Sequence, residues 1–213
     1  MPRRTNVETR SSRTPLLIGL AIVGVVVLLA ILAVALGGLG GGGLSEPATT
    51  PVRVSGDTLP ALDANAATDA AVGQPIPTIT GTDLDGEPMT IAPGGGPMAI
   101  VIVAHWCPHC QAEIPRLVQD IAANGVPEGV TVVGLSTSIN RAQPNYPPSA
   151  WLERERWDEP TLVDDANSTA LAALGVSSFP GFVFVDADGN VVSRTTGEIP
   201  IESWRQALNS IAP

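Results

Sequence analysis

The feature that most limits how this 213-residue chain can fold is a pair of cysteines between an apolar strand and an amphipathic helix. Cys107 and Cys110 are the only cysteines, and the apolar run 98–104 leads almost directly into them. Apolar residues then recur at three- and four-residue steps over 114–121, which is typical of a helix. A Cys-x-x-Cys pair where a strand turns into a helix indicates redox chemistry. The helix N-terminus favours the thiolate of the first cysteine, and the second lies close enough to close a disulfide.

A long apolar run near the N-terminus predicts a membrane anchor. Residues 16–36 form an uncharged stretch of 21 residues, which is long enough to cross a hydrocarbon core. The arginine-rich residues 1–15 carry a charge of +3, so the positive-inside rule keeps them in the cytoplasm. A cleaved signal peptide is the alternative, because residues 33–35 resemble a cleavage pattern, but the run exceeds the roughly 7–15 residues of a signal core. We therefore expect a single-pass anchor in the cytoplasmic membrane and an extracytoplasmic, oxidising location for the rest of the chain.

The rest of the chain is acidic and begins with a segment of low complexity. The whole chain carries −10, so residues 16–213 carry −13, which argues against a nucleic-acid partner. Residues 37–72 are rich in Gly, Pro, Ala and Thr and have no hydrophobic periodicity. This composition predicts a flexible linker between the membrane and a folded domain over 73–213.

From residue 73 onward the pattern is that of an α/β domain. The predicted strands are 76–80, 88–92, 98–104, 130–135, 161–163, 182–185 and 191–194. The predicted helices are 107–123, ended by Asn124-Gly125, then 150–157 with Ser149 as N-cap, 168–174 and 202–211. Residues 139–148 are expected to form a proline-rich loop. Helices between apolar strands predict a mixed central sheet with helices on both faces.

Several separated features together resemble the thioredoxin superfamily, and within it the membrane-anchored TlpA/ResA-like extracytoplasmic thiol–disulfide oxidoreductases. They are the strand leading to Trp106-Cys107-x-x-Cys110, Glu113 and Pro115 in the helix, Phe179-Pro180 before a strand, and the Asp186-x-Asp188-Gly189 hairpin. The resemblance covers about residues 72–212 and implies a thioredoxin-like α/β fold preceded by one transmembrane helix. It also implies protein thiol or disulfide substrates, a membrane or extracytoplasmic redox partner, and no cofactor beyond the cysteine pair.

Cys107 is the expected nucleophile. Its thiolate attacks a disulfide sulfur, and Cys110 resolves the mixed disulfide that results. Pro108 fits the first helical turn, where its missing N–H costs nothing. The imidazole of His109 would favour the Cys107 thiolate through a hydrogen bond or, when protonated, through its charge, and a solvated side chain is the alternative. The Pro-His pair matches the dipeptide of strongly oxidising DsbA-type enzymes.

Glu113 is the expected proton carrier. It lies three residues after Cys110, so helical spacing places both on one face. A partly buried carboxyl group there would have a raised pKa and could move the proton of the buried thiol, whereas an ordinary surface glutamate is the alternative. TlpA/ResA-like proteins carry a glutamate at this position, and many of them act as reductants. Val101 stands where thioredoxins have a buried aspartate, so a proton relay must use Glu113, His109 or water.

The partner-binding surface is expected around Phe179-Pro180, predicted to be a cis-proline loop facing the disulfide. The resemblance implies that the backbone before Pro180 pairs with a substrate strand. The family usually has Thr or Val where Phe179 stands, so its substrate preference does not carry over. Trp106 is expected to shield Cys107 and to contact the partner, with a core aromatic as the alternative. Three other aromatic residues either frame a groove or pack the proline-rich insert: Tyr146, Trp151 and Trp157.

The sequence thus predicts a membrane-tethered enzyme that exchanges disulfides through Cys-Pro-His-Cys. The motif favours an oxidant, whereas Glu113 favours a reductant, for instance in cytochrome c maturation. A thiol peroxidase is one alternative, but the two-residue spacing of the cysteines argues against it. A non-enzymatic metal-binding or metallochaperone module is another, and would require one tight turn to wrap the metal in His105, Cys107, His109 and Cys110. A purely structural disulfide of this spacing would remove little entropy from the unfolded chain.

Overall fold

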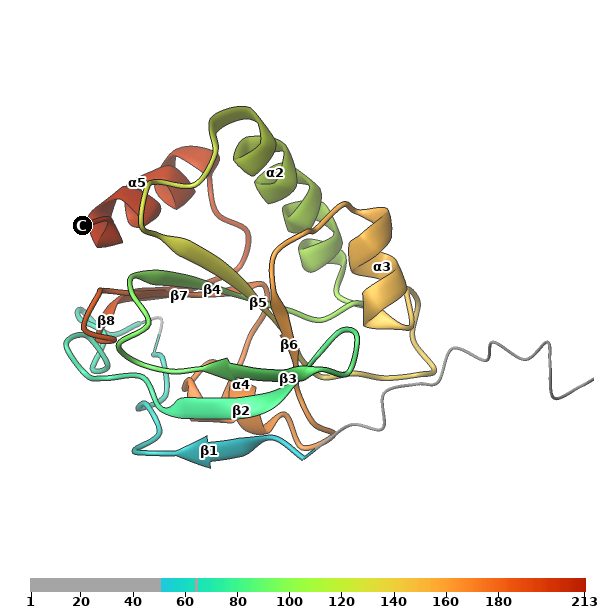
Figure 1. The fold of residues 1–213 in the computed structure, drawn as a ribbon, viewed down its shortest axis with the longest axis horizontal. Coiled ribbons are helices and arrows are strands. Elements are labelled where there is room, and N and C mark those ends of the chain that lie inside the picture. Colours follow the sequence, from blue (N-terminus) through green and yellow to red (C-terminus); the bar gives the residue numbers. More distant parts are fainter. Residues whose placement is uncertain (1–50, 64) are drawn as a thin grey trace, which may run out of the picture. The chain divides into compact units, whose positions relative to one another are not determined.

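The computed structural model describes residues 51–63 and 65–213 (Figure 1). Its strands are β1 (Arg53–Ser55), β2 (Thr78–Asp83), β3 (Pro88–Ile91), β4 (Met98–Val103), β5 (Thr131–Ser136), β6 (Thr161–Val163), β7 (Gly181–Val185) and β8 (Val191–Thr196). Its helices are α2 (Pro108–Asn124), α3 (Pro148–Arg154), α4 (Thr169–Ala173) and α5 (Ile201–Ile211). The predicted membrane anchor, residues 16–36, lies outside the described residues. Within them, no helix combines the length and the apolar character that a membrane crossing requires.

The described strands form one mixed sheet in the order β1-β2-β6-β5-β4-β7-β8, with β3 beside β2. β4 pairs in parallel with β5, and β5 with β6, whereas β7 and β8 are antiparallel neighbours. The central strand β4 is buried over its whole length, which is typical of a strand that is covered on both faces. The predicted mixed sheet and the predicted β2–β3 hairpin are confirmed.

Helices cover both faces of this sheet, as predicted (Figure 1). α2, α3 and α5 lie over one face and α4 lies over the other. Alternate residues of β4 reach the two cores because side chains along a strand point to opposite faces. Ile100 and Ile102 pack in the core that contains α4, whereas Val101 and Val103 pack in the core that contains α2. β4 thus contributes to both cores, and α2 begins a few residues after this strand ends.

Residues 51–63 and 65–72 belong to the fold, so the prediction of a flexible linker is wrong for this stretch. β1 pairs antiparallel with β2, and Val52 and Leu59 are buried. The buried guanidinium of Arg194 donates a hydrogen bond from Nε to Asp69 at 2.8 Å, and this side-chain pairing lowers the pKa of Asp69. The sequence does not indicate this folded segment, because it has few bulky residues. Its ordered residues are held instead by partners that are distant in the sequence.

Helix α3 is shorter than the predicted helix 150–157, and Ser149 is not its cap. Pro147 is the N-cap residue and Pro148 takes the first helical position, where a fixed φ fits and an N–H is not needed. Beyond the C-terminal end, Arg156 has a φ of 61°, which a right-handed helix does not allow. Trp151 and Trp157 are buried in the core that contains α2, so they pack this segment onto the domain.

Candidate active site

The two cysteines stand at the start of α2. Cys107 is the N-cap residue of the helix and Cys110 lies in its first turn. Both are free thiols, and Cys107 is 6 % exposed whereas Cys110 is completely buried. Unpaired N–H groups and the helix dipole favour negative charge at the N-terminus, while burial raises the pKa of Cys110. The helix therefore presents one sulfur at the rim of the fold and keeps the other protonated beneath it.

The loop before β7 lies against the first cysteine. The peptide bond between Phe179 and Pro180 is cis, and the Sγ of Cys107 donates a hydrogen bond to the carbonyl oxygen of Phe179 at 3.5 Å. The ring of Trp106 meets the ring of Phe179 edge to face, with 5.5 Å between the centroids. Both rings are half-buried, so part of each remains available for contact beside the thiol.

Glu113 is completely buried one turn after Cys110. Its carboxylate accepts a hydrogen bond from Nη1 of Arg116 at 2.6 Å and another from the backbone N–H of Ile199 at 3.2 Å. Burial raises the pKa of Glu113, and the Ile199 hydrogen bond and the charge of Arg116 oppose this rise. The negative charge of Glu113 in turn contributes to the raised pKa of Cys110. The carboxyl group is thus close enough to the buried thiol for their ionisations to interact.

Within the described residues, the imidazole of His109 is hydrogen bonded to Glu198 and not to Cys107. Its Nδ1 donates to Oε1 of Glu198 at 2.7 Å, and its side chain is 71 % exposed. The expected hydrogen bond from His109 to the Cys107 thiolate is therefore absent from the structure. A carboxylate from the loop between β8 and α5 takes the ring as its partner, and no local sequence pattern places that carboxylate there.

His105 has a role that the sequence analysis missed. Its ring is completely buried, Nδ1 donates to the carbonyl oxygen of Pro144 at 2.7 Å, and Nε2 accepts the backbone N–H of Asn140 at 3.2 Å. This pattern requires a neutral ring with its proton on Nδ1, and burial lowers the pKa of His105. Nε1 of Trp106 donates to the carbonyl oxygen of Ser138 at 2.8 Å. Together these bonds hold the loop after β5 against the cysteines.

The same contacts weigh against the metal-binding alternative. Both ring nitrogens of His105 are occupied by backbone groups, and Nδ1 of His109 is occupied by Glu198. Across residues 51–63 and 65–213, no three side chains of His, Cys, Asp or Glu are grouped as a metal site would need. The histidine nitrogens would have to give up these partners before the four proposed ligands could hold a metal.

Arg116 and Glu198 join the site, although the sequence analysis singled out neither. Arg116 lies three residues after Glu113 on α2, a spacing at which helical side chains meet, so the sequence did contain a signal for this pair. Glu198 is 89 positions away from His109, and nothing in its local sequence marks it. Arg116 thus joins Glu113, the predicted proton carrier, to the loop before α5, and Glu198 lies in that loop.

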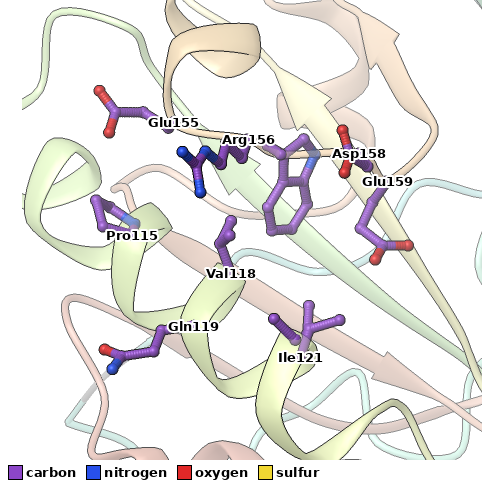
Figure 2. Close-up of a pocket in the computed structure, with 10 residues that line it drawn as sticks. Pro115, Val118, Gln119, Ile121, Glu155, Arg156, Asp158 and Glu159 are labelled. Carbon is purple, nitrogen blue, oxygen red and sulfur yellow. The ribbon is translucent and has the colours of Figure 1, made fainter.

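The structure also has a pocket of about 470 Å³ between α2 and the segment after α3 (Figure 2). It is lined by Pro115, Val118, Gln119, Ile121 and Ala122 of α2, and by Glu155, Arg156, Trp157, Asp158 and Glu159. None of the predicted catalytic or partner-binding residues around the cysteines lines it, whereas Trp157, one of the aromatic residues expected either to frame a groove or to pack the insert, does. The cysteine site and this hollow are therefore separate features of the same helix.

Comparison with known proteins gives a consistent result. Residues 71–209 match the Redoxin family. The chain is 26 % identical over 163 residues to the thiol:disulfide interchange protein DsbE of Pseudomonas aeruginosa, which covers 76 % of this chain and 78 % of the relative. It is 26 % identical over 147 residues to the thiol-disulfide oxidoreductase ResA of Geobacillus thermodenitrificans, covering 68 % and 81 %. The crystal structure of a secreted Mycobacterium tuberculosis disulfide oxidoreductase is similar, with a TM-score of 0.51, 27 % identity, and coverage of 62 % and 94 %.

Proposed function

Because the chain belongs to the Redoxin family, as a TlpA/ResA-like thiol–disulfide oxidoreductase of the thioredoxin superfamily, we propose that it exchanges disulfides with proteins through Cys107 and Cys110. The observation that carries the proposal is the unequal placement of the two thiols. Cys107 lies at the helix N-terminus beside the Phe179 carbonyl, whereas Cys110 is buried next to Glu113. Such a pair separates the nucleophile from the resolving thiol.

In the reducing direction, the Cys107 thiolate attacks one sulfur of a protein disulfide. A bond forms between Cys107 and the substrate, and the other substrate sulfur leaves as a thiolate that takes up a proton. Glu113 then accepts the proton of Cys110, whose thiolate attacks the Sγ of Cys107 and releases the second substrate sulfur. Two electrons have moved from the dithiol to the substrate, and the enzyme holds the disulfide. Oxidation of a substrate dithiol is the same sequence in reverse.

The residues around Cys107 bind the substrate in this proposal. The carbonyl oxygen of Phe179, the residue before Pro180, lies 3.5 Å from the Sγ of Cys107. In this proposal it accepts a hydrogen bond from the backbone of an extended substrate segment. The half-buried rings of Trp106 and Phe179 offer apolar contact area on the same side. Pro108 takes the first position of α2, where no N–H is needed, so the helix begins directly after Cys107. The positive end of the helix dipole therefore lies at Cys107.

We further propose that residues 16–36 anchor the enzyme in the cytoplasmic membrane with its catalytic domain outside. The length of the apolar run and the basic residues before it support this topology. The similar Mycobacterium tuberculosis oxidoreductase is described as secreted, which agrees with an extracytoplasmic site of action. A membrane or extracytoplasmic redox partner would then regenerate the cysteine pair.

The first test is the reduction potential of the full-length chain, equilibrated with glutathione buffers of defined ratio. We expect one reversible two-electron couple that disappears in both Cys107→Ser and Cys110→Ser. A potential near the roughly −120 mV of DsbA would make the enzyme an oxidant, and one near the roughly −270 mV of thioredoxin a reductant, as in cytochrome c maturation. A cysteine pair that does not cycle at any ratio would overturn the proposed function.

The second test separates the roles of the two thiols. With a peptide that contains one disulfide, Cys110→Ser should accumulate a mixed disulfide through Cys107, because the resolving thiol is missing. Cys107→Ser should form none, since its remaining thiol is buried and protonated. Equal trapping by the two variants would contradict the assignment.

A further inference from the structure

Four side chains, an imidazole, a carboxylate, a guanidinium and a second carboxylate, run in series from the surface to the buried Glu113. Nδ1 of His109 lies 2.7 Å from Oε1 of Glu198, and Oε2 of Glu198 lies 3.8 Å from Nη1 of Arg116. The same Nη1 donates to Oε2 of Glu113 at 2.6 Å. Side-chain exposure falls along this series, from 71 % at His109 through 38 % and 37 % to 0 % at Glu113. The series therefore connects a solvated imidazole to a site that water does not reach.

The backbone of the loop between β8 and α5 fixes the geometry of this series. The N–H of Ile199 donates to Glu113 at 3.2 Å, and the carbonyl oxygen of Ile199 accepts from Nη2 of Arg116 at 2.8 Å. Glu198 is the residue before Ile199, so its carboxylate is held between His109 and Arg116 by the same loop. The guanidinium of Arg116 has two hydrogen-bond acceptors, Glu113 and the carbonyl of Ile199, and these two bonds restrict its orientation beside Glu198.

Resting on the proposed function, we propose that Arg116 and Glu198 are positioning residues that link the protonation of His109 to the ionisation of Glu113. Through this link they set the pH range in which Cys110 can give up its proton. His109, which the sequence assigned to the Cys107 thiolate, acts in this proposal on the resolving thiol instead.

The charges predict opposite effects for the two positioning residues. Burial favours the neutral form of Glu113, and the positive charge of Arg116 opposes it. The negative charge of Glu198 acts against ionisation of Glu113. A protonated His109 offsets that charge, so a proton gained at the surface favours loss of the proton at Glu113.

In the part of the chain that the structure describes, few other titratable groups lie on the elements packed against Glu113. On α2 they are the thiols of Cys107 and Cys110, and Asp120, which is paired with Arg205 of α5 at 2.8 Å. Glu202 at the start of α5 is exposed. β4 and β7, which share the core with α2, contain only apolar residues and glycine. The acidic residues after α3 line the pocket of Figure 2, to which Glu113 does not contribute.

The test is a pH titration of the Glu113 side-chain carboxyl carbon by ¹³C NMR, in the reduced full-length chain, with Glu113→Gln to assign the signal. Arg116→Gln should move the midpoint to higher pH by about 1–2 units, because an adjacent opposite charge is lost. Glu198→Gln should move it to lower pH by a few tenths of a unit, since this charge is more exposed. Arg53→Gln and Glu202→Gln change the same charges at exposed positions outside the site and should leave it unchanged.

A double-mutant cycle tests whether the link runs through Glu198. His109→Gln should raise the midpoint in the native background and have no effect when combined with Glu198→Gln. Arg116→Lys, which keeps the charge, should restore most of the native midpoint, and this result would separate a charge effect from damage to the fold. Midpoint shifts of the same sign for Arg116→Gln and Glu198→Gln, or an unchanged His109 effect in the double variant, would overturn the inference.

These results are independent of whether the cysteines exchange disulfides. If the pair does not cycle in glutathione buffers while the carboxyl titration shifts as expected, the proposed function fails and the charge link stands. If the pair cycles and the midpoint of Glu113 is insensitive to Arg116 and Glu198, the link alone fails.

Discussion

The start of α2 is held from two sides, and the two sides use different chemistry. On one, which we call the charged side, the loop between β8 and α5 is bound through Glu198, Arg116 and Glu113. On the other, the neutral side, the loop after β5 is bound through the uncharged ring of His105 and the indole of Trp106. Both sides end at the same cysteine pair, so each can influence it.

The comparison shows that burial gives the two sides opposite responses to pH. Burial raises the pKa of Glu113 and lowers that of His105, because in both cases it favours the neutral form. The contribution of Glu113 to stability is complete below its ordinary value of 4.5 and is lost as the pH rises through its raised pKa. The contribution of His105 is complete above its ordinary value of 6.5 and is lost as the pH falls toward its lowered pKa. A fall in pH therefore increases the contribution of Glu113 to stability and decreases that of His105.

The largest effect is expected from removing the His105 ring. His105→Ala leaves the carbonyl of Pro144 and the N–H of Asn140 without partners and opens a cavity, which should lower the free energy of unfolding by about 2–4 kcal/mol. Denaturant unfolding at pH 7 measures the loss. His109→Ala is the control, because its ring is 71 % exposed and its pair with Glu198 is worth less than about 1 kcal/mol. Equal losses for the two histidines would refute the assignment of His105 to the neutral side.

The next effect concerns the pH dependence of the neutral side. When His105 gains a second proton, Nε2 can no longer accept the N–H of Asn140, so that amide should lose protection from hydrogen exchange as the pH falls from 7 to 5. The loss is at most about 1.4 kcal/mol of opening free energy per pH unit, the limit for one proton. The N–H of Ile199, on the charged side, is the internal reference and should keep its protection. A parallel loss at both amides would indicate general unfolding instead.

On the charged side the sequence predicted Glu113 but not its partners Arg116 and Glu198. On the neutral side it predicted Trp106 as a site residue but not the role of His105. Cys110, Glu113 and the helix that carries them are contiguous, so helical spacing alone placed the carboxyl group near the thiol. Glu198 escaped because it reaches His109 across 89 positions and from a loop. The role of His105 escaped because its partners are the backbone groups of Asn140 and Pro144, which leave no side-chain pattern.

The difference between contiguous patterns and distant partners also explains which elements of the fold could be predicted. The central strand β4, helix α2 and the β2–β3 hairpin have continuous patterns of apolar and turn residues, and these elements were predicted. β1 has only three residues, and the segment after it is held by distant partners, among them the pair of Asp69 and Arg194 and the backbone hydrogen bond from Leu59 to Ala173. Short segments that are stabilised by distant partners have no periodicity for a sequence pattern to detect.

A smaller effect is expected on the charged side. Glu113→Gln keeps the shape of the side chain and removes its titration, so the variant should gain stability relative to the native chain as the pH rises from 4.5 to 8. The gain is limited to about 1.4 kcal/mol per pH unit, over an interval that the Arg116 charge and the Ile199 hydrogen bond keep short. Denaturant unfolding at several pH values measures it, and Glu202→Gln is the matched exposed control. A gain that increases toward acid pH would reverse the sign and refute the burial argument.

The smallest effect is expected from Trp106→Phe, which removes a hydrogen bond of the neutral side without changing any group that titrates. The variant loses the hydrogen bond from Nε1 to the carbonyl of Ser138 but keeps an aromatic ring against Phe179, so the free energy of unfolding should fall by about 1 kcal/mol. Because the indole does not titrate, the loss should be equal at pH 5 and pH 7, unlike the stability changes caused by substitutions at His105 and Glu113, which depend on pH. A pH-dependent loss would mean that Trp106 acts through the ionisation of His105, and the neutral side would then be one coupled unit instead of two independent contacts.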